Sequence, residues 1–343
     1  MTISLCRLED TTVTCRTLGL LVTLTLGLLV APLAAEMQQA TQVYRIGWLS
    51  PGFPRPAHDP PVDAFRQGLR EFGYVEGQHL VMAYRGAEGR IERLPDLAAE
   101  LVQLPVAVMV AVGTAATRAA QGATHTIPIV MTGTSDPVAQ GFVASLARPG
   151  GNITGLSNLM ADLPHKRLEI LTETVPHSAR IAVLVNPDNP PAQSVLNPLT
   201  VAAQALRLHL HVVELRHAEA LDTAFAAMTQ AGADALMVLS DPLLMGDLLG
   251  RVADLATKSR LPAMYDWKMY VEAGGLMSYG TSLPERHRRA ATSVDKILKG
   301  ATPVDLPVEQ STTFELIINL KTAQALGITI PPALLFQADE VIR

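Results

Sequence analysis

Short apolar runs of strand length alternate along this chain with segments of helical period. In the first part the runs lie at 43–49, 80–84, 106–112 and 127–131. Between them, apolar residues recur at helical spacing, as at Phe65, Leu69 and Phe72. Short, fully apolar strands between helices are typical of a parallel sheet that is covered on both faces. The alternation therefore predicts an α/β fold with a doubly wound parallel sheet.

The pattern restarts after the turn signal at 148–152, where Pro, Gly and Asn cluster. The second series has apolar runs at 181–185, 210–215, 235–239 and 261–264, again separated by helical segments. The chain has 343 residues, whereas single hydrophobic cores stop growing at about 250–300 residues. We therefore expect two doubly wound parallel-sheet lobes.

The boundaries of the lobes follow from the turn-rich segments. We assign 43–155 plus 275–302 to lobe 1, and 156–274 plus 303–343 to lobe 2. The chain is expected to cross back to lobe 1 near Gly274-Gly275 and to return near Pro303. The last part reads as a strand at 276–279 and as helices at 284–298 and 314–326. Several hinge crossings of this kind guide the closure of two lobes more firmly than one linker.

The N-terminal segment 1–35 has the pattern of a secretory signal peptide. Arg7 and Arg16 precede the apolar run 18–30, and small residues follow it at Ala31, Ala34 and Ala35. An uncleaved anchor is the alternative, but the run is shorter than the roughly 20 apolar residues that span a bilayer. This segment predicts export to the periplasm.

Composition excludes several classes of function. Both cysteines, Cys6 and Cys15, lie in the leader, so we expect no disulfide, no thiolate nucleophile and no cysteine metal site in the mature chain. The net charge is −5 and the chain has no basic run, which disfavours nucleic acid as a partner.

Several phrases resemble a known family. They are residues 63–77, 127–131, 135–138, 147–155, 306–310 and 317–323. Together they resemble the tryptophan/tyrosine-type ABC transporter substrate-binding proteins over 44–341. The resemblance implies a type I periplasmic-binding-protein fold and a small-molecule ligand held between the lobes. We further expect an ABC permease in the inner membrane as partner, and a monomer. Aromatic amino acids are the best-known ligands of that family.

Ligands of open α/β sheets bind outside the carboxyl ends of the strands. After the run 106–112 come Gly113, Thr114 and Ala115. Gly113 lets the backbone approach a ligand, Thr114 offers a hydroxyl, and the following amides form a helix N-terminus that favours an anion. The alternative is a simple helix cap by Thr114.

Two Asp-Pro pairs follow strands in equivalent places. Asp136 comes after the loop that begins at Thr132, and Asp241 follows the run 235–239. Either carboxylate could pair with the ammonium group of a ligand. The alternative is a turn or cap, for which Asp before Pro is common.

The remaining candidates lie at other strand ends and near the predicted crossings. They are Ser50, Asn158, Asn186, Tyr265 and Tyr279. The hydroxyl and amides could donate hydrogen bonds, and the tyrosines could stack on a planar ligand. Turn geometry and hinge packing are the alternatives, and Trp48 is expected in the core.

The sequence has none of the common catalytic signatures, neither a phosphate-cradling glycine loop nor H-E-x-x-H nor G-x-S-x-G. His209 and His211 alternate along a predicted strand, but no third metal ligand is recognisable nearby. We therefore expect an exported solute-binding protein of an ABC importer without enzyme activity, cofactor or metal. The alternatives are a periplasmic ligand-sensing module and a two-lobed enzyme that resembles a glycosyltransferase.

Overall fold

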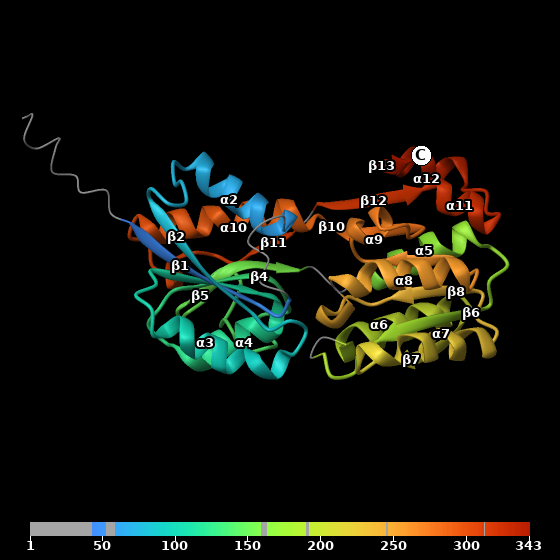
Figure 1. Cartoon of the computed structure of the whole chain (residues 1–343), viewed down its shortest axis with the longest axis horizontal. Helices are drawn as coiled ribbons and strands as arrows, with labels where there is room; N and C mark the ends of the chain where they lie inside the picture. The colour runs from blue at the N-terminus through green and yellow to red at the C-terminus, as the bar shows by residue number, and fades with distance from the viewer. Residues whose placement is uncertain (1–42, 53–58, 159–162, 190–191, 245, 312) are drawn as a thin grey trace, which may run out of the picture. The chain divides into compact units, whose positions relative to one another are not determined.

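The computed structural model describes residues 43–52, 59–158, 163–189, 192–244, 246–311 and 313–343 (Figure 1). The expected signal peptide, 1–35, lies outside these ranges. Residues 44–343 form one compact unit. Among the helices described, none has the length and apolar character needed to span a bilayer.

The first sheet is parallel throughout, in the order β11-β5-β4-β3-β1-β2. Its strands are β1 (Tyr44–Ser50), β2 (Leu80–Gly86), β3 (Val108–Val112), β4 (Ile129–Ser135), β5 (Ile153–Asn158) and β11 (Glu309–Ser311). The fully apolar stretches of β1, β3 and β4 are buried on both faces, as the continuous apolar runs predict.

Helices cover both faces of this sheet. Helices α2 (Pro60–Glu71) and α10 (Leu283–Leu298) pack together on one core, through Phe65, Ala291 and Val294. Helices α3 (Leu94–Val102) and α4 (Gly113–Ala123) pack on the other core. We call this sheet and its helices lobe 1.

The second sheet has the order β13-β12-β10-β9-β8-β6-β7, and only the pair of β10 and β12 is antiparallel. Its strands are β6 (Arg180–Val185), β7 (His209–Glu214), β8 (Ala235–Val238), β9 (Ala263–Tyr265), β10 (Met277–Thr281), β12 (Phe314–Asn319) and β13 (Glu340–Ile342).

Helices also cover both faces of this sheet, which together with them we call lobe 2. Helices α5 (Leu163–Thr174), α6 (Ala192–Ala205), α11 (Leu320–Leu326) and α12 (Pro332–Gln337) share one core. Helices α7 (Leu221–Gln230), α8 (Asp247–Lys258) and α9 (Lys268–Glu272) share the other. The prediction of two α/β lobes with mainly parallel sheets is confirmed.

The crossings differ from those expected. Strand β10 joins the second sheet, so the chain crosses to lobe 1 at Ser282 and not at Gly274-Gly275. It then stays in lobe 1 through β11 and returns after Ser311, not near Pro303. The expected assignments of 275–281 to lobe 1 and of 303–311 to lobe 2 are therefore wrong. The local sequence of a short strand does not show which of two sheets it joins, because this depends on the distant strands with which it pairs.

Three elements differ from the prediction. The segment expected as one helix at 314–326 is β12 followed by α11, because Asn319 accepts a hydrogen bond from the Thr322 amide and so caps a new helix. Strand β5 was not predicted, and β4 continues to Ser135 where a loop was expected from Thr132. The polar residues of β4 hid its length, although Thr132, Thr134 and Ser135 are buried.

Candidate functional site

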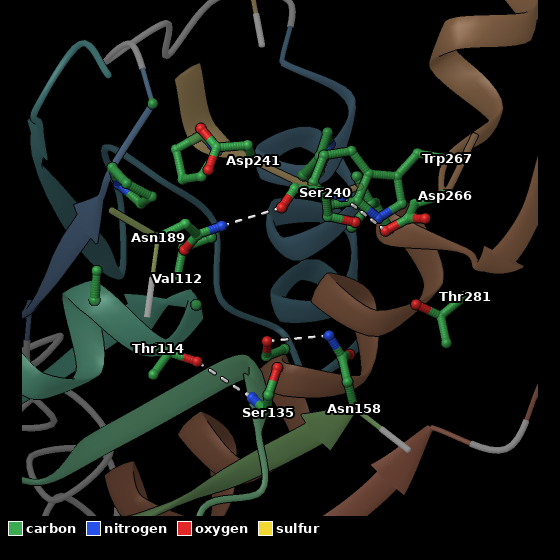
Figure 2. Close-up of a pocket in the computed structure, with 18 of the residues that line it drawn as sticks. Val112, Thr114, Ser135, Asn158, Asn189, Ser240, Asp241, Asp266, Trp267 and Thr281 are labelled. Atoms are coloured by element: carbon green, nitrogen blue, oxygen red, sulfur yellow. Dashed lines mark hydrogen bonds between the residues drawn. The ribbon is translucent and has the colours of Figure 1, made fainter. Parts of the chain in front are cut away.

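A cavity of about 320 Å³ is lined by both lobes. From lobe 1 it is lined by Ser50, Gly113, Thr114, Ser135, Asn158 and Arg286. From lobe 2 it is lined by Asn186, Asn189, Ser240, Asp241, Asp266 and Trp267. In Figure 2, Thr114, Ser135 and Asn158 lie on one side of this space, and Asn189, Ser240 and Asp241 lie on the other.

Most of the predicted binding residues line this cavity. They are Ser50, Gly113, Thr114, Ala115, Asn158, Asn186 and Asp241. Each follows a strand of a parallel sheet or ends one, so the strand-end rule placed them together. Asp136, Tyr265 and Tyr279 do not line it.

Gly113 and Thr114 begin helix α4 at the cavity wall. Gly113 has a φ of +78°, a conformation that favours glycine. The Thr114 hydroxyl accepts a hydrogen bond from the Ser135 amide at 3.3 Å and does not cap its own helix (Figure 2). This bond ties the start of α4 to the end of β4.

Asp136 has a local role. It is exposed, and its Oδ1 accepts a hydrogen bond from the Ala139 amide at 3.0 Å. Its φ of +36° turns the chain at the end of β4. The expectation that Asp136 faces a ligand is wrong in this structure, because the carboxylate closes a turn outside the cavity.

The two tyrosines are packing residues. Tyr265 is fully buried and stacks on Tyr270, with 4.7 Å between ring centroids. The Tyr279 ring lies 6.0 Å from that of Phe314 and packs against the lobe 2 core. Neither ring lines the cavity: neighbouring side chains cover Tyr265, and the half-buried Tyr279 packs toward the lobe 2 core.

Asp241 is a buried carboxylate at the cavity wall. Its Oδ1 accepts hydrogen bonds from Asn186 Nδ2 at 3.2 Å and from the Leu243 amide at 2.7 Å. Its Oδ2 has no hydrogen-bond partner among the described residues. Burial raises the pKa of Asp241 to about 6, because a low-dielectric surrounding disfavours the charged form. A partner that donates a proton or carries positive charge would satisfy Oδ2.

Arg286 is the cationic counterpart in lobe 1, and the sequence did not reveal it. It lies in the first turn of α10 and is 6% exposed. Its Nη1 donates to Asn158 Oδ1 at 2.9 Å, whereas its Nε has no partner. Within the described residues no carboxylate pairs with it, and burial lowers its pKa to about 10. It remains a cation at neutral pH.

The backbone of β4 makes room for Arg286. Strand β4 has a register shift against β5 between Thr132 and Thr134, which places Gly133 in a bulge. A Cβ at Gly133 would lie 2.5 Å from Arg286 Cζ. Bulges of this kind often occur next to binding sites, where they redirect the neighbouring groups.

A buried ion pair forms part of the lobe 2 wall. Arg167 Nη1 lies 2.5 Å from Asp266 Oδ1, and both side chains are nearly inaccessible. Arg167 Nε also donates to the Tyr279 carbonyl at 2.6 Å, and Asp266 Oδ2 accepts from the Ser240 amide at 3.1 Å. Burial lowers the pKa of Arg167 and raises that of Asp266, and each charge opposes the shift of the other. The pair therefore fixes the loops after β8 and β9.

His287 also lines the cavity but is a structural group. Its Nδ1 donates to the Leu283 carbonyl at 2.7 Å, and its Nε2 lies 3.3 Å from the Thr132 hydroxyl. Burial lowers its pKa to about 3, so the ring is neutral. In the described part of the chain, no group of three or more His, Cys, Asp or Glu is placed to hold a metal.

This arrangement defines a class of protein. Two doubly wound lobes joined by three crossings enclose a cavity. Its described lining includes the Arg286 guanidinium, which no described carboxylate pairs, the half-satisfied Asp241 carboxylate, and several amides and hydroxyls. Such a site can bind a small polar molecule between lobes that move about a hinge. The fold and the cavity are those of a two-lobed ligand-binding protein.

The chain belongs to the ABC transporter substrate binding protein family, whose sequence profile matches residues 53–342. It is 27% identical over 274 residues to a tyrosine-binding protein of Clostridioides difficile, and the match covers 80% of this chain and 78% of the relative.

Solved structures agree with this assignment. An ABC domain from Streptococcus pneumonia in complex with L-Trp is 26% identical, with a TM-score of 0.79 over 88% of this chain and 100% of that one. A conserved domain protein of Vibrio cholerae is 29% identical, with a TM-score of 0.78 over 88% of this chain and 99% of that one. A LacI family regulator from Bifidobacterium animalis shares the fold at 13% identity, with a TM-score of 0.56 over 79% of this chain and 95% of the regulator.

Proposed function

We propose that this protein is the exported solute-binding component of an ABC importer and that it binds an amino-acid-like solute between its lobes. The observation that carries the proposal is the buried guanidinium of Arg286 at the cavity wall, which has no carboxylate partner among the described residues. A buried charge is costly unless it is paired. A solute with a carboxylate supplies the missing charge.

Asp241 gives the solute its second contact. Asp241, whose Oδ2 has no partner among the described residues, lines the lobe 2 side of the same cavity. An ammonium group is the natural partner of a carboxylate that already accepts two hydrogen bonds at its other oxygen. A solute that bears both charges can therefore contact both lobes at once.

Trp267 supports a solute with an apolar or aromatic side chain. The indole lines the cavity beside Ser240 and Asp266 (Figure 2). Large, amphipathic rings are typical of sites that bind planar ligands. The tyrosine and L-Trp bound by two relatives are solutes of this type.

Closure of the lobes is the mechanism that we propose. A solute that contacts Arg286 and Asp241 together stabilises only the closed state, so binding shifts the population toward that state. The ABC permease then recognises the closed form. In this proposal the protein acts as a monomer in the periplasm, catalyses no reaction and binds no nucleic acid.

A thermal-shift screen with the purified protein tests the proposal. The panel contains L-tryptophan, L-tyrosine, the other amino acids, nucleosides, sugars and simple carboxylates. A solute that binds the native state raises the melting temperature by mass action. We expect amino acids to raise it and neutral sugars to leave it unchanged. A response to sugars or nucleosides alone would contradict the proposal.

The Arg286→Gln variant tests the site itself. Hydrogen bonds to a charged group contribute about 1.5–3 kcal/mol, so the variant should bind its amino acid about 10- to 100-fold more weakly by titration calorimetry. Arg288→Gln is the control, because Arg288 lies on the same helix but pairs with Glu71 and Glu285 at the surface. Equal affinities of both variants and the wild type would exclude Arg286 as a contact.

A further inference from the structure

Asn158 lies where lobe 1 meets the segments that cross to lobe 2. It is the last residue of β5, directly before the first crossing. In the sheet its backbone is paired with Ser311, directly before the third crossing. Its side chain accepts from Arg286, which lies one helical turn after the second crossing at Ser282. One residue therefore adjoins the lobe 1 ends of all three crossings.

The Asn158 amide holds two groups in a defined geometry. Its Oδ1 accepts from Arg286 Nη1 at 2.9 Å. Its Nδ2 donates to the Gly133 carbonyl at 3.1 Å, the bond drawn from Asn158 in Figure 2. The guanidinium thus lies between the β4 bulge and the end of β5. The opposite edge of the group carries Nε, which has no partner in the described residues.

The amide also leaves the cation uncompensated. An aspartate at this position would make the same contact to Nη1 but would neutralise Arg286, and the cavity would lose its anion preference. A neutral acceptor orients the guanidinium and leaves its full charge for a ligand. Fixing a charged group before binding reduces the ordering cost at the moment of binding.

We propose that Asn158 is the positioning residue of the anion subsite, and that it couples this subsite to the hinge. The inference rests on the proposed function, because it takes Arg286 as the contact for the carboxylate of the solute. Asn158 orients the guanidinium and ties the first turn of α10 to the end of β5. A carboxylate bound at Arg286 thereby acts on the segments where the chain passes between the lobes.

The affinity test uses Asn158→Ala and Asn158→Asp, with L-tryptophan and L-tryptophanamide as probes. The amide of the second probe replaces the carboxylate of the first. We expect both variants to bind L-tryptophan about 10- to 100-fold more weakly, because a hydrogen bond to a charge is lost or the charge is neutralised. Binding of L-tryptophanamide should change less than threefold, because it makes no ionic contact with Arg286.

Asn152→Ala is the matched control. Asn152 precedes the other end of β5, and its Nδ2 donates to the Thr124 and Ile127 carbonyls. It is remote from the cavity lining, so its loss should leave both affinities unchanged. An equal loss of both probes in Asn158→Ala would show a structural role only and would overturn the inference.

Hydrogen exchange tests the coupling without a ligand. In Asn158→Ala we expect the amides of Arg286 and His287 to exchange roughly tenfold faster, because the first turn of α10 loses its tie to β5. Asn152→Ala should leave them unchanged. Unaltered exchange in Asn158→Ala would overturn the coupling.

The two proposals fail separately. If Arg286→Gln keeps full affinity for L-tryptophan, the proposed contact fails, whatever Asn158 does. If Arg286→Gln loses affinity while Asn158→Ala keeps it, the proposed function stands and only the positioning role is refuted.

Discussion

Gly133 offers a sharp test of how the anion subsite is built. The residue has a φ of +73°, and a Cβ there would lie 2.5 Å from Arg286 Cζ. Carbon atoms in contact lie about 3.5–4.0 Å apart, so Gly133→Ala would force the guanidinium to move by about 1 Å or more. Such a shift breaks the hydrogen bond to Asn158 and misplaces the charge.

The expected magnitude has two parts. The backbone conformation of a non-glycine residue at this φ costs roughly 1–2 kcal/mol of unfolding free energy. The displaced Arg286 loses a charged hydrogen bond, which should weaken amino-acid binding by about 10- to 100-fold. Backbone strain lowers the unfolding free energy when any glycine with such a φ is replaced, whereas the displacement of Arg286 follows only from the change at Gly133.

Gly141→Ala separates the two parts. Gly141 has a φ of +72°, but a Cβ there would meet nothing within 4 Å. Urea unfolding should show a similar loss of stability from backbone strain in both variants, and calorimetry with L-tryptophan should show weaker binding only in Gly133→Ala. Equal affinities of the two variants would refute the role of the bulge.

Three further predictions concern the cavity walls and the core. Burial raises the pKa of Asp241 from 3.8 to about 6, so the native state favours the protonated carboxyl. The stability that this group contributes is therefore full below pH 4 and is lost as the pH rises through 6. Asp241→Asn should remove this pH dependence of the unfolding free energy, which amounts to ~3 kcal/mol. In the wild type, L-tryptophan should bind more tightly at pH 7 than at pH 5, since only the ionised carboxylate attracts an ammonium group. Arg167→Met leaves Asp266 buried without its partner and should cost about 3–5 kcal/mol in urea unfolding, whereas a loss below 1 kcal/mol would show that the pair contributes little. Tyr265→Phe should keep both stability and affinity, because the hydroxyl has no partner in the described structure; a clear loss of binding would restore Tyr265 as a ligand contact.

The strand-end rule found cavity residues in both lobes, five in lobe 1 and two, Asn186 and Asp241, in lobe 2. Asn186 directly follows β6, and Asp241 comes three residues after the end of β8, so the strand-end rule was sufficient to find them. Tyr265 also ends a strand, but its ring packs on Tyr270 in the core. A position at the end of a strand does not predict the direction in which the side chain points.

Arg286 could not be found from local sequence. Its place in the cavity depends on the crossing at Ser282, on the packing of α10 against α2, and on the bulge at Gly133. Each of these is a long-range feature. The apolar stripe of α10 predicted the helix, yet nothing in its spacing shows that an arginine in its first turn is buried next to β4.

Lobe 1 is discontinuous in the sequence, and this affects the order of folding. The core around Phe65 is completed by Ala291 and Val294 of α10, and the sheet is completed by β11. During synthesis, lobe 1 therefore cannot complete this core and this sheet until α10 and β11 have been made, after most of lobe 2. Contacts of such high sequence separation slow folding. For a chain that crosses a membrane before it folds, this delay is an advantage, because the core of lobe 1 stays incomplete until α10 and β11 are present.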